Sequence, residues 1–252
     1  MIGVLAPPGR YRAAVAELPL RTRLVDREDG AVVVVPGGPR WVDAGLAAVA
    51  AGARAVVVAD PGFAAAADVR RLAQAGIPVI IERPLLREDV SSDANDARGS
   101  ESGWTEPRAV VVDGVAPAAK RLEVLCDALG WVRVLSGGRL TLVAADAALA
   151  LLETTGAMPA TLTFVATERP SGWIRAHALG EVITEVEVVE GRARVATTTV
   201  AGRLTAPTRF ESSERLAMRR ALDALERDVL PRDLDELAAD AGLAARIIDA
   251  TP

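Results

Sequence analysis

The scarcest chemical groups in the chain limit what it can catalyse. Among 252 residues there is one histidine, His177, and one cysteine, Cys126. Histidine is the usual general base near neutral pH, and transition-metal sites need several Cys or His ligands at short spacing. We therefore predict no metal centre and no internal disulfide. His177 lies in WIRAHAL, where we expect a half-exposed residue of a sheet and not a catalyst.

The first turn departs from the pattern that binds a dinucleotide. The apolar run IGVLA leads into Pro-Pro-Gly-Arg-Tyr. Such a strand-to-helix turn binds pyrophosphate when glycines in the pattern Gly-x-Gly-x-x-Gly let backbone N–H groups approach it. Ala6, Pro8 and Tyr11 stand at the three glycine positions, and Pro8 has no N–H to offer.

Other residues near the ends of predicted strands remain as candidate cofactor contacts. Asp26 follows a second strand at a suitable distance to accept hydrogen bonds from an adenine ribose, or it is a turn residue. For the first turn the alternative is an ordinary tight turn. The candidates in the first turn and in the loop after the third strand are Pro7, Gly9, Arg10, Pro36 and Gly37.

Strands and helices alternate along the first third of the chain. The runs predict strands at 2–6, 21–26, 31–35, 53–60 and 77–82, and helices at 10–18, 41–52 and 63–76. Such βαβ units form a parallel sheet covered by helices. No helix is predicted between the second and third strands, because DREDG runs directly into AVVVV. This half is therefore contracted relative to a complete dinucleotide-binding domain.

The rest of the chain is expected to form a second domain. Residues 90–107 show no apolar periodicity and are rich in Ser, Asp and Gly, which predicts a flexible loop or linker between a Rossmann-like domain at 1–89 and an α+β domain at 108–252. The expected fold class is α/β, with a Rossmann-like parallel sheet followed by a mainly antiparallel one. The elements expected in the second domain are strands at 108–114, 131–138, 160–167, 172–179, 182–190 and 192–200, a hairpin turn at 190–191, and helices at 118–129, 146–156, 213–230 and 233–250.

Composition excludes several classes of partner. The chain has 29 basic and 34 acidic residues, a net charge of -5 and no basic run, so we expect no nucleic acid partner. No apolar stretch reaches the roughly 20 residues of a membrane span. The single cysteine and the absence of a signal-peptide pattern favour the cytoplasm.

Several sequence segments, taken in their order along the chain, resemble the glucose-fructose oxidoreductase and inositol dehydrogenase family of NAD(P)-dependent enzymes. The stretch 31–60 followed by PVIIERPL resembles the family's run from its third Rossmann strand to its Glu-Lys-Pro motif. Phrases at 116–135, 146–167 and 219–249 resemble the later helices and sheet. The alternative is an unrelated protein that has a Rossmann-like N-terminal domain and an α+β C-terminal domain.

The resemblance implies an NAD or NADP site that this chain has altered or lost. Glu82, Arg83 and Pro84 match Glu-Lys-Pro with arginine in place of the lysine that helps move a proton. Glu82 and Pro84 are then cofactor contacts. Arg83, the single catalytic candidate, stays protonated and acts at best as an anion clamp. Its alternative role is to end a strand beside solvent.

The resemblance also implies a helix with the pattern Asp-x-x-x-His-x-x-Asp, which places an acid and a base on one face. On TLVAADAALALL the matching positions are Thr141, Ala145 and Ala148. Asp146 lies one residue from the histidine position. We therefore expect the general acid/base to be missing.

Three functions compete. The preferred hypothesis is a degenerate family member that binds a nucleotide or a sugar-like small molecule weakly, or serves as a non-catalytic subunit. The second is an active NAD(P)-dependent oxidoreductase of sugars or polyols. The third is a CoA- or nucleotide-binding module, because 32–63 also resembles the CoA-binding domain of acyl-CoA synthetases. The resembled fold further implies a homodimer through the sheet at 160–210.

Overall fold

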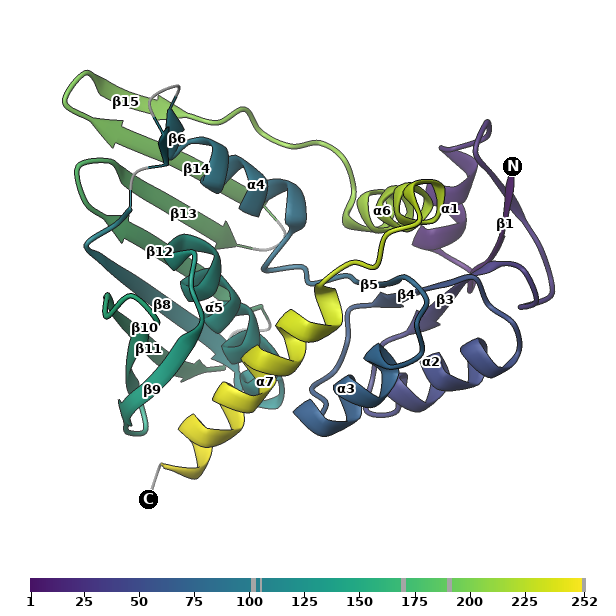
Figure 1. Ribbon diagram of the computed structural model, residues 1–252, viewed down its shortest axis with the longest axis horizontal. Helices are drawn as coiled ribbons and strands as arrows, with labels where there is room; N and C mark the ends of the chain where they lie inside the picture. The colour runs from purple at the N-terminus through teal and green to yellow at the C-terminus, as the bar shows by residue number, and fades with distance from the viewer. Residues whose placement is uncertain (101–102, 105, 169–170, 190–191, 251–252) are drawn as a thin grey trace. The chain divides into compact units, whose positions relative to one another are not determined.

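The computed structural model describes residues 1–100, 103–104, 106–168, 171–189 and 192–250 (Figure 1). The chain folds into two compact units. Unit 1 comprises Met1–Pro84 and Phe210–Ala239, and unit 2 comprises Leu85–Arg209 and Asp240–Pro252. The chain therefore returns to unit 1 late, so that residues 210–239 fold with the Rossmann-like half and not with the C-terminal sheet.

Unit 1 is built on a five-stranded sheet whose strands are all parallel, in the order β2-β1-β3-β4-β5. The strands are β1 (Ile2–Leu5), β2 (Thr22–Leu24), β3 (Val32–Pro36), β4 (Ala55–Ala59) and β5 (Val79–Ile81). All five strands predicted in this half are confirmed. The missing helix is confirmed as well, because the chain passes from β2 to β3 through residues 25–31 without one.

Helices cover both faces of this sheet (Figure 1). They are α1 (Arg10–Ala16), α2 (Trp41–Ala50), α3 (Ala66–Ala73), α6 (Ser213–Arg227) and the first turns of α7 (Asp233–Asp249). On β3, Val32 and Val34 pack with α1 and α6, whereas Val33 and Val35 pack with α2 and α3. A strand buried on both faces needs a continuous apolar run, which explains AVVVV.

Unit 2 is built on an eight-stranded sheet in the order β15-β14-β13-β12-β8-β11-β10-β9. Only β8 and β11 pair in parallel. The strands are β8 (Ala109–Pro117), β9 (Leu140–Ala145), β10 (Leu149–Thr154), β11 (Pro159–Thr167), β12 (Trp173–Leu179), β13 (Ile183–Val189), β14 (Arg192–Thr199) and β15 (Gly202–Thr205). The mainly antiparallel sheet is thus confirmed. The predicted turn at 190–191 lies outside the described residues, although β13 and β14 do pair antiparallel.

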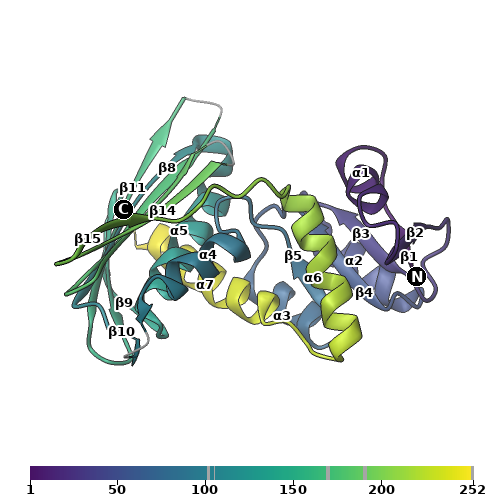
Figure 2. The same ribbon diagram turned by 90° about the horizontal axis from the view of Figure 1, so that it is seen from above.

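One face of this sheet is covered by helices and the other is open (Figure 2). The covering helices are α4 (Glu88–Asp96), α5 (Arg121–Ser136), which follows the short 3-10 helix η1 (Ala118–Lys120), and the later turns of α7. Along β12, Ile174, Ala176 and Ala178 are buried, whereas Arg175 and Leu179 are exposed. This alternation is the pattern of an antiparallel sheet with one solvated face.

The expectation of a structureless segment at 90–107 is wrong for its first part. Residues 88–96 form α4, and Val90, Ala94 and Arg98 are buried. The guanidinium of Arg98 donates to the carbonyl of Leu135 in the last turn of α5. Short strands β6 (Gly99–Ser100) and β7 (Gly103–Trp104) follow. Three buried side chains thus anchor a sequence of polar composition, and residues 101–102 and 105 lie outside the described residues.

Two further predictions are wrong in secondary-structure type. Residues 131–136, expected as a strand, continue α5 until Gly137 ends it with a left-handed φ of 68°. Residues 146–156, expected as a helix, form a turn and then β10. On β10, Ala150, Leu152 and Thr154 are buried and alternate with exposed residues, a period of two that an Ala- and Leu-rich run conceals. In α5, burial on nearly all sides outweighs the strand propensity of its valines.

Candidate functional site

The carboxyl ends of the parallel strands in unit 1 gather the predicted site residues at one edge of the sheet. Ligands of doubly wound folds bind outside this edge. The turn after β1 holds Pro7, Gly9 and Arg10, and the segment after β5 holds Glu82, Arg83 and Pro84. Asp26, two residues beyond the end of β2, is exposed. These candidates therefore lie together at the carboxyl edge of the sheet, and their contacts decide what they can bind.

The first turn has few groups that could hold a pyrophosphate. Gly9 precedes α1 with φ 111°, and α1 has only 7 residues. Pro8 contributes no N–H, and the guanidinium of Arg12 donates to the carbonyl of Ala6, 3.2 Å away. Arg10 is exposed, with its Nη1 3.5 Å from Oε1 of Glu214. The exposed cation Arg10 thus lies beside a carboxylate of this chain.

A hydrogen-bonded group closes the same edge. The hydroxyl of Tyr11 donates to Oε2 of Glu82 at 2.5 Å, and the hydroxyl of Ser213 donates to Oε1 at 2.5 Å. Tyr11 and Glu82 are buried. Ser213 is the first residue of α6, whose positive N-terminal end favours a carboxylate nearby. Glu82 therefore joins α1, β5 and α6, and both of its oxygens accept bonds within the chain.

Further acids surround this Tyr11–Glu82–Ser213 group. Burial raises the pKa of Glu82, and the charges of Glu214 and Asp60 raise it further, against the opposing effect of its two hydrogen bonds. Burial and then the charge of Glu82 also raise the pKa of Tyr11, so its hydroxyl stays protonated. The acidic side chains of Asp60, Glu82 and Glu214 thus interact electrostatically at the carboxyl edge of the sheet.

The loops after β3 and β4 pack on each other. A Cβ on Gly37 would lie 1.9 Å from the carbonyl oxygen of Asp60, so no other residue fits there. Nε1 of the buried Trp41 donates to the carbonyl of Gly62 at 2.8 Å. Pro36 is the last residue of β3 and is exposed. Gly37 was a candidate cofactor contact from the sequence, and the structure requires glycine there because the two loops touch.

Arg83, the catalytic candidate, is a buried residue with 8% of its surface exposed. Pro84 beside it is partly buried and closes the first segment of unit 1. The alternative of an arginine beside solvent is therefore wrong. A buried guanidinium stays charged and cannot cycle a proton near neutral pH.

The helix expected to carry an acid and a base is not where the sequence placed it. Thr141 and Ala145 lie on β9, and Ala148 lies in the turn before β10. Oδ1 of Asp146 accepts from the backbone N–H groups of Ala148 and Leu149, both at 2.8 Å, which lowers the pKa of Asp146. Asp146 therefore forms the hairpin turn.

Helix α5 packs on this sheet, and two titratable groups occur on it at a four-residue spacing. Glu123 and Asp127 are four residues apart on α5, and Asp127 is buried. The two titratable side chains four residues apart on this helix are therefore both carboxylates. Both residues lie within the helix predicted at 118–129, and they were not proposed because the motif was sought at 141–148.

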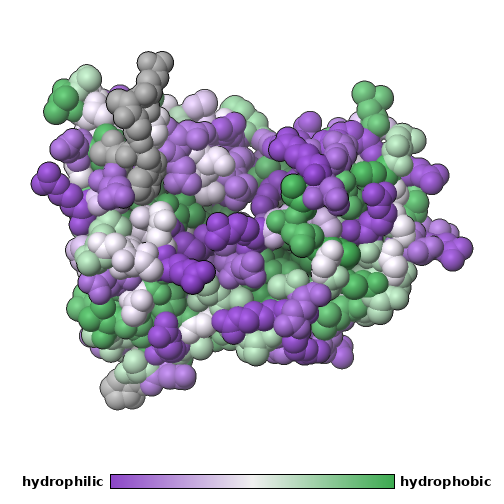
Figure 3. Space-filling view, viewed as in Figure 1, coloured by the Kyte–Doolittle hydropathy of each residue, from purple (hydrophilic) through white to green (hydrophobic). Residues whose placement is uncertain are grey.

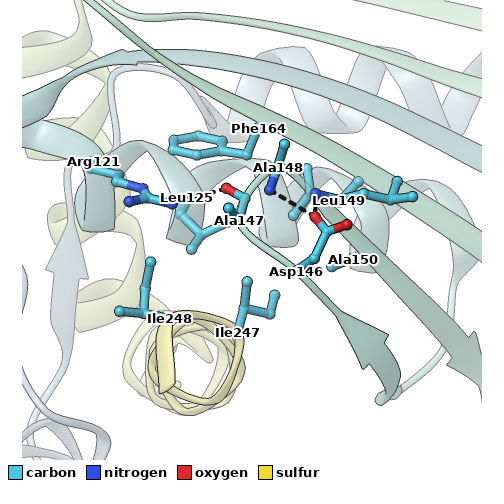
Figure 4. Close-up of a pocket in the computed structure, with 11 residues that line it drawn as sticks. Arg121, Leu125, Asp146, Ala147, Ala148, Leu149, Ala150, Phe164, Ile247 and Ile248 are labelled. Carbon is cyan, nitrogen blue, oxygen red and sulfur yellow. Dashed lines mark hydrogen bonds between the residues drawn. The ribbon is translucent and has the colours of Figure 1, made fainter. Parts of the chain in front are cut away.

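A small cavity lies beside α5 in unit 2 (Figure 4). It is lined by Arg121, Leu125, the β9–β10 turn, Phe164 of β11 and Ile247 of α7. Its volume is about 10 Å³, room for a single water molecule. Arg121 donates to the carbonyl of Ala147 at 3.1 Å, which fixes the turn. The cavity is a packing feature and cannot hold a nicotinamide or a sugar.

The single histidine and the single cysteine both lie within secondary structure of unit 2. His177 lies half-buried on β12, as predicted, and Cys126 is buried in α5. Across the described ranges, no group of three or more His, Cys, Asp or Glu side chains could hold a metal ion. Among the same residues, no helix is both long and apolar enough to cross a membrane.

Sequence comparison finds no matching family model and no matching curated protein. Solved structures, however, share the fold over nearly the whole chain. A 3-ketoreductase from Actinomadura kijaniata, solved with NADP and TDP-benzene, has a TM-score of 0.64 at 13% identity, over 100% of this chain and 89% of that one. The likeness in fold is therefore much greater than the likeness in sequence.

Two other solved structures agree. The UDP-N-acetylglucosamine 3-dehydrogenase GnnA from Acidithiobacillus ferrooxidans has a TM-score of 0.61 at 14% identity, covering 99% of this chain and 97% of that one. The dehydrogenase MviM from Clostridium difficile has a TM-score of 0.69 at 8% identity, covering 99% and 98%. At these identities the likeness shows the fold alone, and the fold agrees with the one expected from the sequence.

Proposed function

We propose that this chain is a non-catalytic protein with the fold of NAD(P)-dependent sugar oxidoreductases, and that it acts as a subunit of an assembly formed through its open sheet. The observation that carries the proposal is the Tyr11–Glu82–Ser213 group. It occupies the edge at which this fold receives a dinucleotide, and it adds negative charge there.

The residues at this edge do not fit a dinucleotide. A pyrophosphate needs several N–H donors and a positive field. The first turn offers a proline and a short helix, and Asp60, Glu82 and Glu214 contribute like charge. Like charges at close range disfavour binding, so any affinity of the turn for NAD, NADP or CoA is weak.

A turnover assay tests the proposal. The purified protein is mixed with NAD or NADP and a panel of sugars, polyols and nucleotide sugars, and the absorbance of the reduced nicotinamide is followed. We expect no turnover with any pair. Robust turnover would contradict the proposal and favour an active oxidoreductase, in which Asp127→Asn and Arg83→Ala should then each reduce the rate.

A repair experiment tests the same proposal from the opposite direction. Ala6→Gly with Pro8→Gly restores two of the three glycines, and Glu214→Gln removes one acid while keeping its shape. We expect the triple variant to bind NADPH more tightly than the wild type. Equal and tight binding by both proteins would show that the turn was competent from the start.

A further inference from the structure

A hollow of about 290 Å³ lies on the open face of the unit 2 sheet, over β8 and β12–β15. Apart from Val186, every residue that lines it has a titratable side chain. These residues are the acids Asp113, Glu185 and Glu187, the arginines Arg175, Arg194 and Arg203, and His177. The charges of the acids and the arginines sum to zero, so the hollow is strongly polar without a net charge of either sign.

Two ion pairs hold the walls of the hollow in place. Nη2 of Arg175 lies 2.7 Å from Oε1 of Glu187, and Arg203 donates to Oε2 of Glu185. Arg175 also lies over the ring of Trp173, 5.8 Å from its centre. Each of the two glutamates uses one oxygen in its ion pair, and within the described ranges its other oxygen accepts no hydrogen bond. The walls therefore present carboxylate acceptors whose positions are fixed.

The single histidine of the chain faces the same hollow. On β12, His177 lies opposite Glu185 of β13 and Val111 of β8. The carboxylate of Glu185 is bonded to Arg203, and among the described residues no hydrogen bond involves the imidazole. A neutral imidazole donates from one ring nitrogen and accepts at the other. His177 thus offers one donor and one acceptor to a molecule in the hollow.

The balance of charge selects the class of ligand. A phosphate or a carboxylate would meet three acidic side chains in the hollow, and an amine would meet three guanidinium groups, and both arrangements are unfavourable. A hydroxyl group both donates and accepts, so a molecule with several hydroxyls bonds to the carboxylates and to the guanidinium groups at once. The volume is close to the roughly 300 Å³ of the smallest ligand pockets, which suits a single sugar ring.

We propose that this hollow binds a neutral polyol of the size of a monosaccharide. Its hydroxyls donate to the outer oxygens of Glu185 and Glu187, and accept from the guanidinium of Arg194 and the imidazole of His177. The site binds without catalysing, because it lies on the face of the sheet that no helix covers and holds no group placed to transfer a hydride.

The hollow is separate from the apolar part of the open face. Val143, Leu149 and Leu151 are exposed on β9 and β10, where Figure 3 shows hydrophobic surface, and none of them lines the hollow. The inference therefore goes beyond the proposed function and does not depend on it. A partner bound over β9 and β10 leaves the hollow over β12–β15 to its ligand.

The imidazole of His177 gives a readout confined to the hollow, because the C–H proton signals of the only histidine are single in an NMR spectrum. The wild-type protein is titrated with glucose, galactose, mannose, ribose and sorbitol, each to about 50 mM, and with inorganic phosphate and choline at matched ionic strength. We expect a saturable shift of the His177 signals with at least one neutral polyol and no saturable shift with phosphate or choline.

A double variant tests the chemistry of the walls. Glu185→Gln with Glu187→Gln keeps the shape of both side chains and gives the hollow a net positive charge. It should bind the polyol at least about 10-fold more weakly, and should now bind phosphate. The control Glu153→Gln makes the same chemical change at an exposed position of β10 outside the hollow, and should bind the polyol like the wild type.

Three results would each overturn the proposal. The first is the absence of a saturable His177 shift with every neutral polyol, which would make the hollow a solvated charged surface. The second is saturable binding of phosphate or choline by the wild type, which would make it a site for an ion. The third is equal polyol affinity in the double variant and in Glu153→Gln. None of these results bears on whether the chain turns over a nicotinamide cofactor.

Discussion

The carboxyl edge of the parallel sheet in unit 1 and the open face of the sheet in unit 2 treat their charged groups in opposite ways. At the edge, the carboxylate of Glu82 is buried and bonded by two hydroxyls of the same chain. On the open face, Arg175 and Glu187 form an ion pair of 2.7 Å whose side chains are 51% and 38% exposed, and Asp113 and Arg194 lie beside them on the neighbouring strands. At the unit 1 edge the polar groups bond to one another in the interior, whereas on the open face of unit 2 they are exposed to solvent.

Under the proposed function, the unit 1 edge does not bind a dinucleotide and the open face of unit 2 contacts a partner, and this difference is what that function expects. A fold can keep its packing while its site changes, because the apolar core and the polar edge are separate sets of residues. In unit 1, Val32–Val35 and the helices on both faces preserve the sheet. At the edge above that core, both oxygens of Glu82 accept hydrogen bonds from hydroxyls of the same chain.

The largest effect should come from the core that holds α6 on the sheet. Met218 is fully buried against β strands of unit 1, so Met218→Ala should lower the free energy of unfolding by about 2–5 kcal/mol. Leu151→Ala, on the open face and 41% exposed, should change it by less than about 0.5 kcal/mol. Urea unfolding measures both, and equal losses would contradict the contrast between a closed and an open region.

A smaller effect should follow loss of one hydrogen bond at the edge. Tyr11→Phe removes a donor to a buried carboxylate and keeps the ring, so it should cost about 1–3 kcal/mol in unfolding free energy. The matched change Ser213→Ala removes the other donor. If neither variant lost stability, Glu82 would not be held by these bonds.

The dependence of stability on pH should distinguish the edge from the surface. Burial raises the pKa of Glu82 above its ordinary value of 4.5, so ionising this acid costs more free energy in the folded state than in the unfolded chain. The stability from this group is then complete below pH 4.5 and is lost as the pH rises through the folded value. Glu82→Gln cannot ionise, and should gain stability relative to the wild type across that rise.

The control for this prediction is Glu153→Gln on the exposed side of β10, which makes the same chemical change away from the edge. Its stability should follow the wild type across the pH range. A Glu82→Gln curve parallel to that of the wild type would show that the acid is not perturbed by its surroundings.

The smallest effect on folding should come from the open face. Arg175→Ala breaks an ion pair in which both side chains are at least 38% exposed, so the monomer should lose less than about 1 kcal/mol. Thermal unfolding at low protein concentration measures it. A loss of unfolding free energy as large as that of Met218→Ala would mean that the Arg175–Glu187 ion pair belongs to the core and not to an open surface.

Much of the fold followed from local patterns in the sequence. The five parallel strands, the missing helix before β3 and four of the antiparallel strands show apolar runs or alternation with turn residues between them. The errors fell where local pattern and burial disagree. Residues 88–96 are polar yet form α4 because Val90, Ala94 and Arg98 are buried, and 146–154 is a hairpin whose period of two is concealed by alanine and leucine.

The sequence predicted which edge of the sheet the candidate residues lie at, but it did not predict which residues they contact there. Parallel strands bring their carboxyl ends to one edge, so Gly9, Arg10, Glu82 and Arg83 were expected there. The partners of Glu82 were not, because Ser213 is 131 residues away and no local signal links them. Tyr11 was visible only as a departure from a glycine pattern, and the same departure turned out to supply the hydroxyl that closes the edge.

The most direct test of the central claim is a calorimetric titration of the wild-type protein with NADPH at physiological ionic strength, because the claim concerns the binding of a pyrophosphate at the unit 1 edge. We predict no saturable heat up to about 1 mM cofactor, which corresponds to less than about 4 kcal/mol of binding free energy. Saturation at one NADPH per chain with a dissociation constant of about 10 μM or lower would contradict the account.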